Sequence, residues 1–133
     1  MWTIKIPGEP TPKGRPRVYR GRAVTPQKTR MYEARVAAAA RVADLPRFDR
    51  EEALEVSVTG VWPRPRRLCR VCDPDERIPK ATRPDGDNLA KAILDGLSAH
   101  FDDAQVVRLT VAKFYADRVE GPGVNVDVGF AGE

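Results

Sequence analysis

The sequence is poor in cysteine, histidine and long apolar runs. It contains two cysteines, Cys69 and Cys72, and a single histidine, His100. These residues fall short of a full structural zinc ligand set, so we expect reduced thiols in a flexible loop, with zinc or a disulfide as the alternative. No apolar stretch approaches the roughly 20 residues of a membrane span, and no charged leader precedes an apolar segment. We therefore expect a cytoplasmic protein without a membrane partner.

Positive charge is concentrated in two segments. The 23 lysine and arginine residues exceed the 19 aspartate and glutamate residues, for a formal charge of +4. Tyr19 lies in the first segment and is a candidate for stacking on an exposed base. Such clusters favour a nucleic-acid partner, although two solvated basic loops are the alternative. The first segment, which has no acid, carries Lys13, Arg15, Arg17, Arg20, Arg22, Lys28 and Arg30, and the second carries Arg64, Arg66, Arg67 and Arg70.

The hydrophobic pattern predicts a single domain over residues 1–133, of α/β (α+β) class, with a mixed sheet of about four strands covered by two helices. Basic loops occupy about 7–25 and 63–84, the first with a short hairpin around Arg20-Gly21-Arg22. Thr25-Pro26 is a helix start, because threonine can cap and proline suits the first turn. In chain order we expect strand 2–6, helix 25–43, strand 53–62, helix 87–98, and strands 106–115 and 124–128 joined as a hairpin across Gly121-Pro122-Gly123.

Carboxylates gather around the second predicted helix of this otherwise basic chain. Asp85 and Asp87 stand at its start, and Lys91 lies one turn beyond Asp87 on the same face. Asp103 follows the helix, and an antiparallel return would bring it back beside the helix start. Because carboxylates repel the phosphates that basic loops attract, we expect a cation among them, and Mg²⁺ favours oxygen ligands. In the structural alternative, Asp87 caps the helix, Lys91 is its ion-pair partner and Asp102-Asp103 forms a turn.

Two segments resemble the RusA family of Holliday-junction resolvases, especially members from phages and prophages. The family pattern is D-x-D-N-L-x-K, a short helix and then D-D-x-Q-V. The chain has Asp85-Gly86-Asp87-Asn88-Leu89-Ala90-Lys91 and then Asp102-Asp103-Ala104-Gln105-Val106. Residues 6–17 and Thr25-Pro26 also resemble family members, so the likeness spans nearly the whole chain. It implies a RusA-like fold and a magnesium-dependent homodimer that nicks two opposing strands of a four-way DNA junction.

The resemblance also implies roles for individual residues. Asp85, Asp87 and Asp103 would be the essential acids that hold Mg²⁺, for which Mn²⁺ can substitute, and Lys91 the essential lysine. No organic cofactor is implied. One departure is Pro84, which replaces the arginine that can directly precede the first acid and leaves Arg83 one position earlier. The residues expected to contact DNA are Lys13, Arg15, Arg17, Arg20, Arg22 and Arg83.

Two other functions are compatible with these residues. A non-catalytic nucleic-acid-binding module would use the acids only as caps and turns. A metal-dependent phosphohydrolase acting on small phosphorylated molecules would use the acids but would not need such extensive basic loops. We predict an endodeoxyribonuclease that resolves four-way junctions by paired symmetric nicks, acting in recombination and repair in a bacterial or phage-infected cell.

Overall fold

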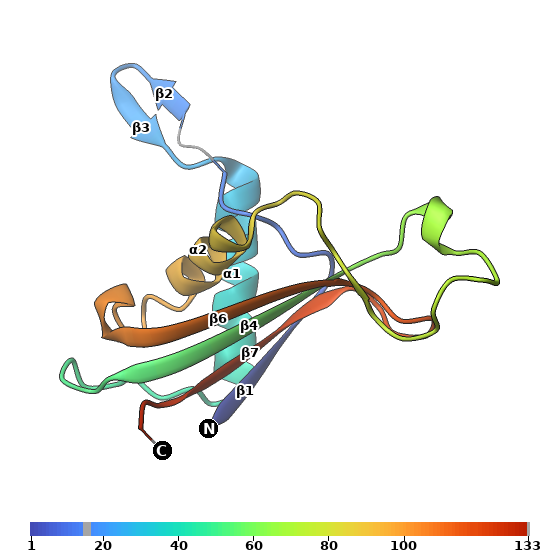
Figure 1. Ribbon diagram of the computed structural model, residues 1–133. Helices are drawn as coiled ribbons and strands as arrows, with labels where there is room; N and C mark the ends of the chain where they lie inside the picture. Colours follow the sequence, from blue (N-terminus) through green and yellow to red (C-terminus); the bar gives the residue numbers. More distant parts are fainter. Residues whose placement is uncertain (15–16, 133) are drawn as a thin grey trace.

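The computed structural model describes residues 1–14 and 17–132 and contains a five-stranded sheet packed against two helices (Figure 1). Helices α1 (Gln27–Val42) and α2 (Gly86–Gly96) bury side chains in the same core as the sheet. The architecture confirms the predicted mixed sheet with two helices, and a short edge strand is added to it. The strands, in the order in which they lie in the sheet, are β1 (Trp2–Pro7), β7 (Gly123–Phe130), β4 (Leu54–Trp62), β6 (Val106–Tyr115) and β5 (Ile78–Pro79).

Strand β4 lies at the centre of the sheet, and the alternating burial of its side chains explains why this segment forms a strand. Leu54, Val56 and Val58 are buried, whereas the polar residues between them are partly exposed. This period-two pattern suits a strand with one face in the core. Strand β4 pairs in parallel with β6 and antiparallel with β7, and β7 in turn pairs antiparallel with β1. The remaining face of the sheet is more polar and is not covered by the helices.

The expected hairpin between residues 106–115 and 124–128 is wrong. Both segments are strands, but β6 and β7 lie on opposite sides of β4 and do not pair with each other. The segment that contains Gly121 and Pro122 carries the chain across to the far side of β4. Alternation shows which face of a strand is buried, but it does not show which strand lies beside it. The sequence pattern therefore located both strands and gave the wrong neighbours.

Helix α1 follows the predicted helix, but it is not capped as expected. Pro26, and not Thr25, occupies the N-cap position and makes no side-chain capping hydrogen bond, so the predicted threonine cap is wrong. None of the helices among the described residues combines the length and the apolar character needed to cross a membrane. The buried residues of α1 recur at helical spacing and form one stripe that faces the sheet, namely Thr29, Tyr32, Val36 and Ala40.

Helix α2 begins slightly earlier than expected, with Asp85 in the N-cap position. It packs closely against α1, because a Cβ atom added to Gly96 would lie only 2.7 Å from the Cβ of Val36. A larger residue at this position would push the two helices apart. The close contact fixes the rotation of α2, so that its charged face points away from the core. The predicted buried face is confirmed by Leu89, Ala92, Ile93, Gly96 and Leu97.

A hairpin projects from the body of the molecule near the start of α1 (Figure 1). It consists of β2 (Arg17–Tyr19) and β3 (Arg22–Val24), which pair antiparallel and form a sheet of their own. The turn residues Arg20 and Gly21 have φ angles of 51° and 76°. Two positive φ angles are typical of a type I′ hairpin turn. The predicted hairpin is confirmed, and residues 17–24 are called the arm below.

The connection over residues 63–84, in which we expected a flexible loop, is crossed by hydrogen bonds from a side chain to backbone carbonyls. The guanidinium group of Arg64 donates to backbone carbonyls at 2.7 to 3.3 Å, on both sides of the loop. Arg118 adds a contact of 3.0 Å to the carboxylate of Asp75. The thiols of Cys69 and Cys72 are free and exposed. One guanidinium therefore joins several parts of the loop to each other and to Ala116, which follows β6.

Candidate active site

The two acids at the start of α2 are exposed, and their side chains make no contact that holds the fold together within the part of the chain that the structure describes. Asp85 occupies the N-cap position, but its side chain makes no capping hydrogen bond, and Asp87 lies in the first turn. Across residues 1–14 and 17–132, neither carboxylate forms an ion pair or accepts a hydrogen bond. The alternative in which Asp87 caps the helix and pairs with Lys91 is therefore wrong. The positive end of the helix dipole favours negative charge at this position.

Two lysines fix the segment that leads into Asp85. The Nζ atom of Lys113 donates to the backbone carbonyls of Thr82 and Pro84, both at 2.8 Å. The Nζ atom of Lys80 donates to the hydroxyl of Thr82 at 2.6 Å. Neither lysine was predicted to have this role from the sequence. Lys113 was a signal in the sequence, because it falls on the core-facing side of a predicted strand. A charged group at such a position needs hydrogen-bond acceptors nearby.

The exposed face of α2 continues beyond Asp87 with Lys91 and Asp95. Each of these residues lies roughly 6 Å further along the helix axis, because an α-helix rises about 1.5 Å per residue. Lys91 is exposed, and Asp95 is partly buried. The face therefore carries an acid, a lysine and an acid over two successive turns, and it is open to a ligand at Asp87 and Lys91.

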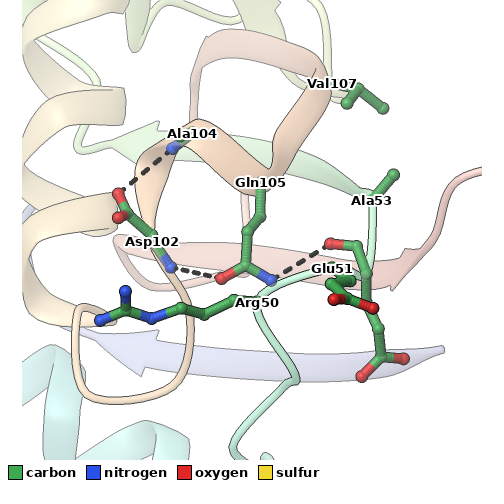
Figure 2. Close-up of a pocket in the computed structure, with 8 residues that line it drawn as sticks. Arg50, Glu51, Ala53, Asp102, Ala104, Gln105 and Val107 are labelled. Carbon is green, nitrogen blue, oxygen red and sulfur yellow. Dashed lines mark hydrogen bonds between the residues drawn. The ribbon is translucent and has the colours of Figure 1, made fainter.

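Asp103 is the first residue of the short 3₁₀ turn η2 (Asp103–Gln105), which follows α2. The turn is closed by a capping box at Asp102. The Asp102 carboxylate accepts a hydrogen bond from the Ala104 amide at 3.3 Å, and the Gln105 side chain accepts one from the Asp102 amide at 2.9 Å (Figure 2). Because both ends of the turn are tied, the backbone that carries Asp103 is well defined.

Gln105 fastens this turn to the body of the protein. Its side chain is buried, and its amide group donates to the backbone carbonyl of Asp49 at 2.8 Å and to that of Glu52 at 3.1 Å. Figure 2 shows the bond to the segment just before Ala53. These two carbonyls lie just before β4. This role of Gln105 was not predicted from the sequence, although aspartate followed three residues later by glutamine is a recognisable capping pattern. Gln105 is a positioning residue for Asp103.

The carboxyl group of Asp103 lies near Lys91 and Asp95. Burial raises its pKa, the negative charges of Asp95 and Asp102 raise it further, and the Lys91 ammonium lowers it. Asp103 and Asp95 line the same surface cavity, so the return brings Asp103 beside the later part of α2 and not to its start. In the part of the chain that the structure describes, no three aspartate, glutamate, histidine or cysteine side chains are close enough to share a metal ion.

Lys13 has a structural role that the sequence did not predict. Its Nζ atom lies 2.6 Å from Glu33 of α1 and 2.8 Å from Asp95 of α2. Its side chain is only 19% exposed, so both partners compete effectively with water. We infer that Lys13 joins the two helices and that its charge is already neutralised by protein carboxylates.

The other basic residues named from the sequence differ in what the structure shows of them. Arg20 and Arg22, at the tip of the arm, and Arg83, just before the first acid, are exposed. Arg15 lies outside the described residues, and only the backbone of Arg17 is described. The described arginines therefore present positive charge on the arm and beside the start of α2.

Comparison with protein-family models identifies the chain. The model for Endodeoxyribonuclease RusA matches residues 7–128 and so includes the arm, the acidic face of α2 and Asp103. No curated protein matches the chain. Enzymes of this family hydrolyse DNA at junctions, which favours the nuclease over the non-catalytic module and the small-molecule phosphohydrolase. Because the match covers most of the 133 residues, the chain belongs to the RusA family of endodeoxyribonucleases.

Proposed function

We propose that the protein is a magnesium-dependent resolvase that makes two symmetric nicks in a four-way DNA junction. The observation that carries this proposal is the exposed face of α2, where Asp85, Asp87 and Lys91 are available to a ligand and Asp103 lies beside Lys91. Unpaired carboxylates on a protein of net charge +4 oppose DNA binding unless a cation offsets them. A nuclease needs both the basic surface and such an acidic site.

We propose that Asp85, Asp87 and Asp103 hold Mg²⁺ and that Mn²⁺ can substitute. The donor chemistry fits, since magnesium favours carboxylate and water oxygens, and the two acids of α2 have no other partner among the described residues. The raised pKa of Asp103 agrees with this assignment, because a cation would relieve the repulsion from the neighbouring acids. Because no three acids among the described residues are close enough to share a metal ion, the proposal requires α2 and the intact turn η2 to approach each other when metal and DNA bind. The metal would supply Lewis-acid activation of the phosphoryl group and of a water molecule.

The side chains of the chain itself contribute charge and position. The Lys91 ammonium is near Asp103 and would stabilise the negative charge that develops on the phosphate, or help to protonate the leaving oxygen. The positive end of the α2 dipole acts in the same direction. Lys80 and Lys113 hold the segment before Asp85 in place, so that this acid is positioned before DNA arrives.

We also propose that residues 1–133 act as one catalytic domain within a homodimer. A four-way junction has approximate two-fold symmetry, and a two-fold dimer presents two identical sites to it. The exposed arginines of the arm and Arg83 would contact backbone phosphates, which position the protein without reading sequence. Such an enzyme would act in DNA recombination and repair, in the cytoplasm of a bacterial or phage-infected cell.

Cleavage assays on matched substrates test the proposal. The protein is incubated with a labelled four-way junction, a linear duplex of the same sequence and p-nitrophenyl phosphate, each with Mg²⁺, Mn²⁺ or EDTA. We expect two symmetric nicks in the junction alone, and only when a divalent ion is present. Binding without cleavage, equal cleavage of the duplex, or hydrolysis of the small phosphate ester would contradict the proposal.

A further inference from the structure

Tyr19 differs from the other aromatic residues in its exposure. Among the aromatic side chains in the described part of the chain it is the only exposed one, with 64% of its surface accessible. The others are buried or half-buried in and around the core. An exposed aromatic ring does not make the hydrophobic contacts that stabilise a buried ring. An exposed ring at the end of a projecting hairpin is therefore typical of a binding element.

The arm presents this ring together with other uncovered apolar side chains. Val18 is 78% exposed and Val24 is 40% exposed. Tyr19 pairs with Arg22 across the hairpin, and Val24 lies on the same face, because paired and alternate residues share a side of the ladder. An isolated two-stranded hairpin is only marginally stable in water. A partner that covers this face would therefore stabilise the arm as well as bind it.

The charge of the arm indicates what that partner is. Residues 13 to 30 contain no acid, and Arg20 and Arg22 are exposed beside Tyr19. The guanidinium of Arg20 lies 5.4 Å from the centroid of the Tyr19 ring. Two such arms would repel each other, so a second copy of this chain is a poor occupant for the tip. Nucleic acid supplies phosphates for the arginines and flat bases for the ring.

The root of the arm is tied to the helix that carries the acidic site. The backbone N–H of Lys13 donates to the carbonyl of Asn88 at 3.2 Å, and the N–H of Gly14 donates to the hydroxyl of Thr29 at 3.0 Å. The ion pair between Lys13 and Asp95 adds a second link to α2. Lys13 and Gly14, which precede the arm in the chain, are therefore held beside α2, so the position of DNA bound by the arm is related to the position of the acids on α2.

We propose that Tyr19 stacks on a base at the branch point of junction DNA and determines the preference for branched over linear DNA. The inference rests on the proposed function and deepens it. Stacked bases inside a linear duplex leave no free face for the ring, whereas base pairs at a branch point can lose a stacking neighbour. Arg20 and Arg22 contact phosphates in both kinds of DNA and so add affinity without discrimination.

Equilibrium binding measured with Ca²⁺ in place of Mg²⁺, so that no cleavage is needed, tests this inference. Fluorescence anisotropy gives the affinity for a four-way junction and for a linear duplex of the same sequence. We expect Tyr19→Ala to lower the affinity for the junction about tenfold, the effect of losing one stacked base, and to leave the affinity for the duplex unchanged. Tyr19→Trp should retain the preference, and Arg22→Ala should weaken both complexes alike. Val42→Ala, an exposed apolar residue at the end of α1, serves as the control.

The outcomes separate this inference from the proposed function. If the wild-type protein prefers the junction and Tyr19→Ala keeps that preference, the role of Tyr19 is disproved while the proposed function stands. Equal weakening of both complexes, or a change of oligomeric state seen by light scattering, would likewise overturn the role of Tyr19. A wild-type protein that does not prefer the junction would contradict both.

Discussion

At the scale of single residues, Asp87 is exposed and has no hydrogen-bond or ion-pair partner among the described residues, so its substitution changes charge without removing such a contact. We predict that Asp87→Asn abolishes junction cleavage, with a loss of at least about a hundredfold, which is the upper range for residues that support a metal site. Junction binding should persist or become tighter, because one negative charge near the phosphates is gone. Gel-based cleavage and binding assays measure the two effects.

A matched control for this variant is Asp44→Asn. Asp44 is exposed, lies after α1 far along the chain from α2, and has a φ angle of 55°, a conformation that asparagine tolerates well. Its substitution should leave both assays unchanged. Full activity of Asp87→Asn in the presence of Mg²⁺ would remove Asp87 from the chemistry.

Asp103 links the site to the pH dependence of stability. Its pKa is raised in the folded protein above the ordinary value of 3.8, mainly by burial. A raised pKa means that ionisation opposes folding, so this penalty is absent below pH 3.8 and develops fully above the raised pKa. Without divalent ions, Asp103→Asn should therefore unfold at a slightly higher temperature than the wild type at pH 7. The difference should vanish toward pH 3.5, as calorimetry can measure, whereas a less stable variant at pH 7 would contradict the assignment.

At the scale of elements, η2 depends on the buried amide group of Gln105. We predict that Gln105→Ala destabilises the protein by about 1–3 kcal/mol, because the carbonyls of Asp49 and Glu52 would lose their donor. Cleavage should fall as well at temperatures where the variant is folded, since the backbone carrying Asp103 would lose its anchor. Urea denaturation and single-turnover cleavage give the two values.

Gln27→Ala provides the comparison, since Gln27 is exposed at the start of α1 and its loss should stay within about 0.5 kcal/mol. A Gln105→Ala variant with wild-type stability and cleavage would show that the turn is held by other contacts.

The positions of the helices and strands were predicted from the sequence better than the pairing of the strands in the sheet. The apolar spacing of α2 and the alternation of β4 are local signals, and both elements lie where they were expected. The arm was also predictable, because Arg20-Gly21 is a turn sequence. The hydrogen bonds that cross the loop over residues 63–84 were not predictable, since Arg64 reaches carbonyls that are distant in the sequence. Such nonlocal hydrogen bonds leave no periodic pattern.

The candidate site was predictable in its residues but not in its geometry. The motif places Asp85, Asp87 and Lys91 on one exposed face, as the helical period requires. The location of Asp103 depends on where η2 is fastened, and that is decided by Gln105 and the carbonyls before β4. The separation of Asp103 from the start of α2 therefore could not be predicted from the sequence and is seen only in the structure.

At the scale of the whole molecule, the acidic site lies on α2, with the arm tied beside it and the loop over residues 63–84 leading into its start (Figure 1). We predict that the protein is a dimer in solution, because paired nicks in a two-fold symmetric junction require two sites. Size-exclusion chromatography with light scattering should give twice the mass of one chain. A monomer at high concentration that still makes paired nicks would show that dimers form only on DNA or not at all.

The central claim is that Asp85, Asp87 and Asp103 bind one metal site together. Its most direct test is a crystal structure of the wild-type protein with Mn²⁺ and a four-way junction that carries a non-cleavable phosphate. Anomalous scattering locates the manganese independently of the refined coordinates. The account predicts manganese held by Asp85, Asp87 and Asp103 together, next to the phosphate and within reach of Lys91. Manganese bound elsewhere, or bound at Asp85 and Asp87 with Asp103 still beside Asp95, would contradict it.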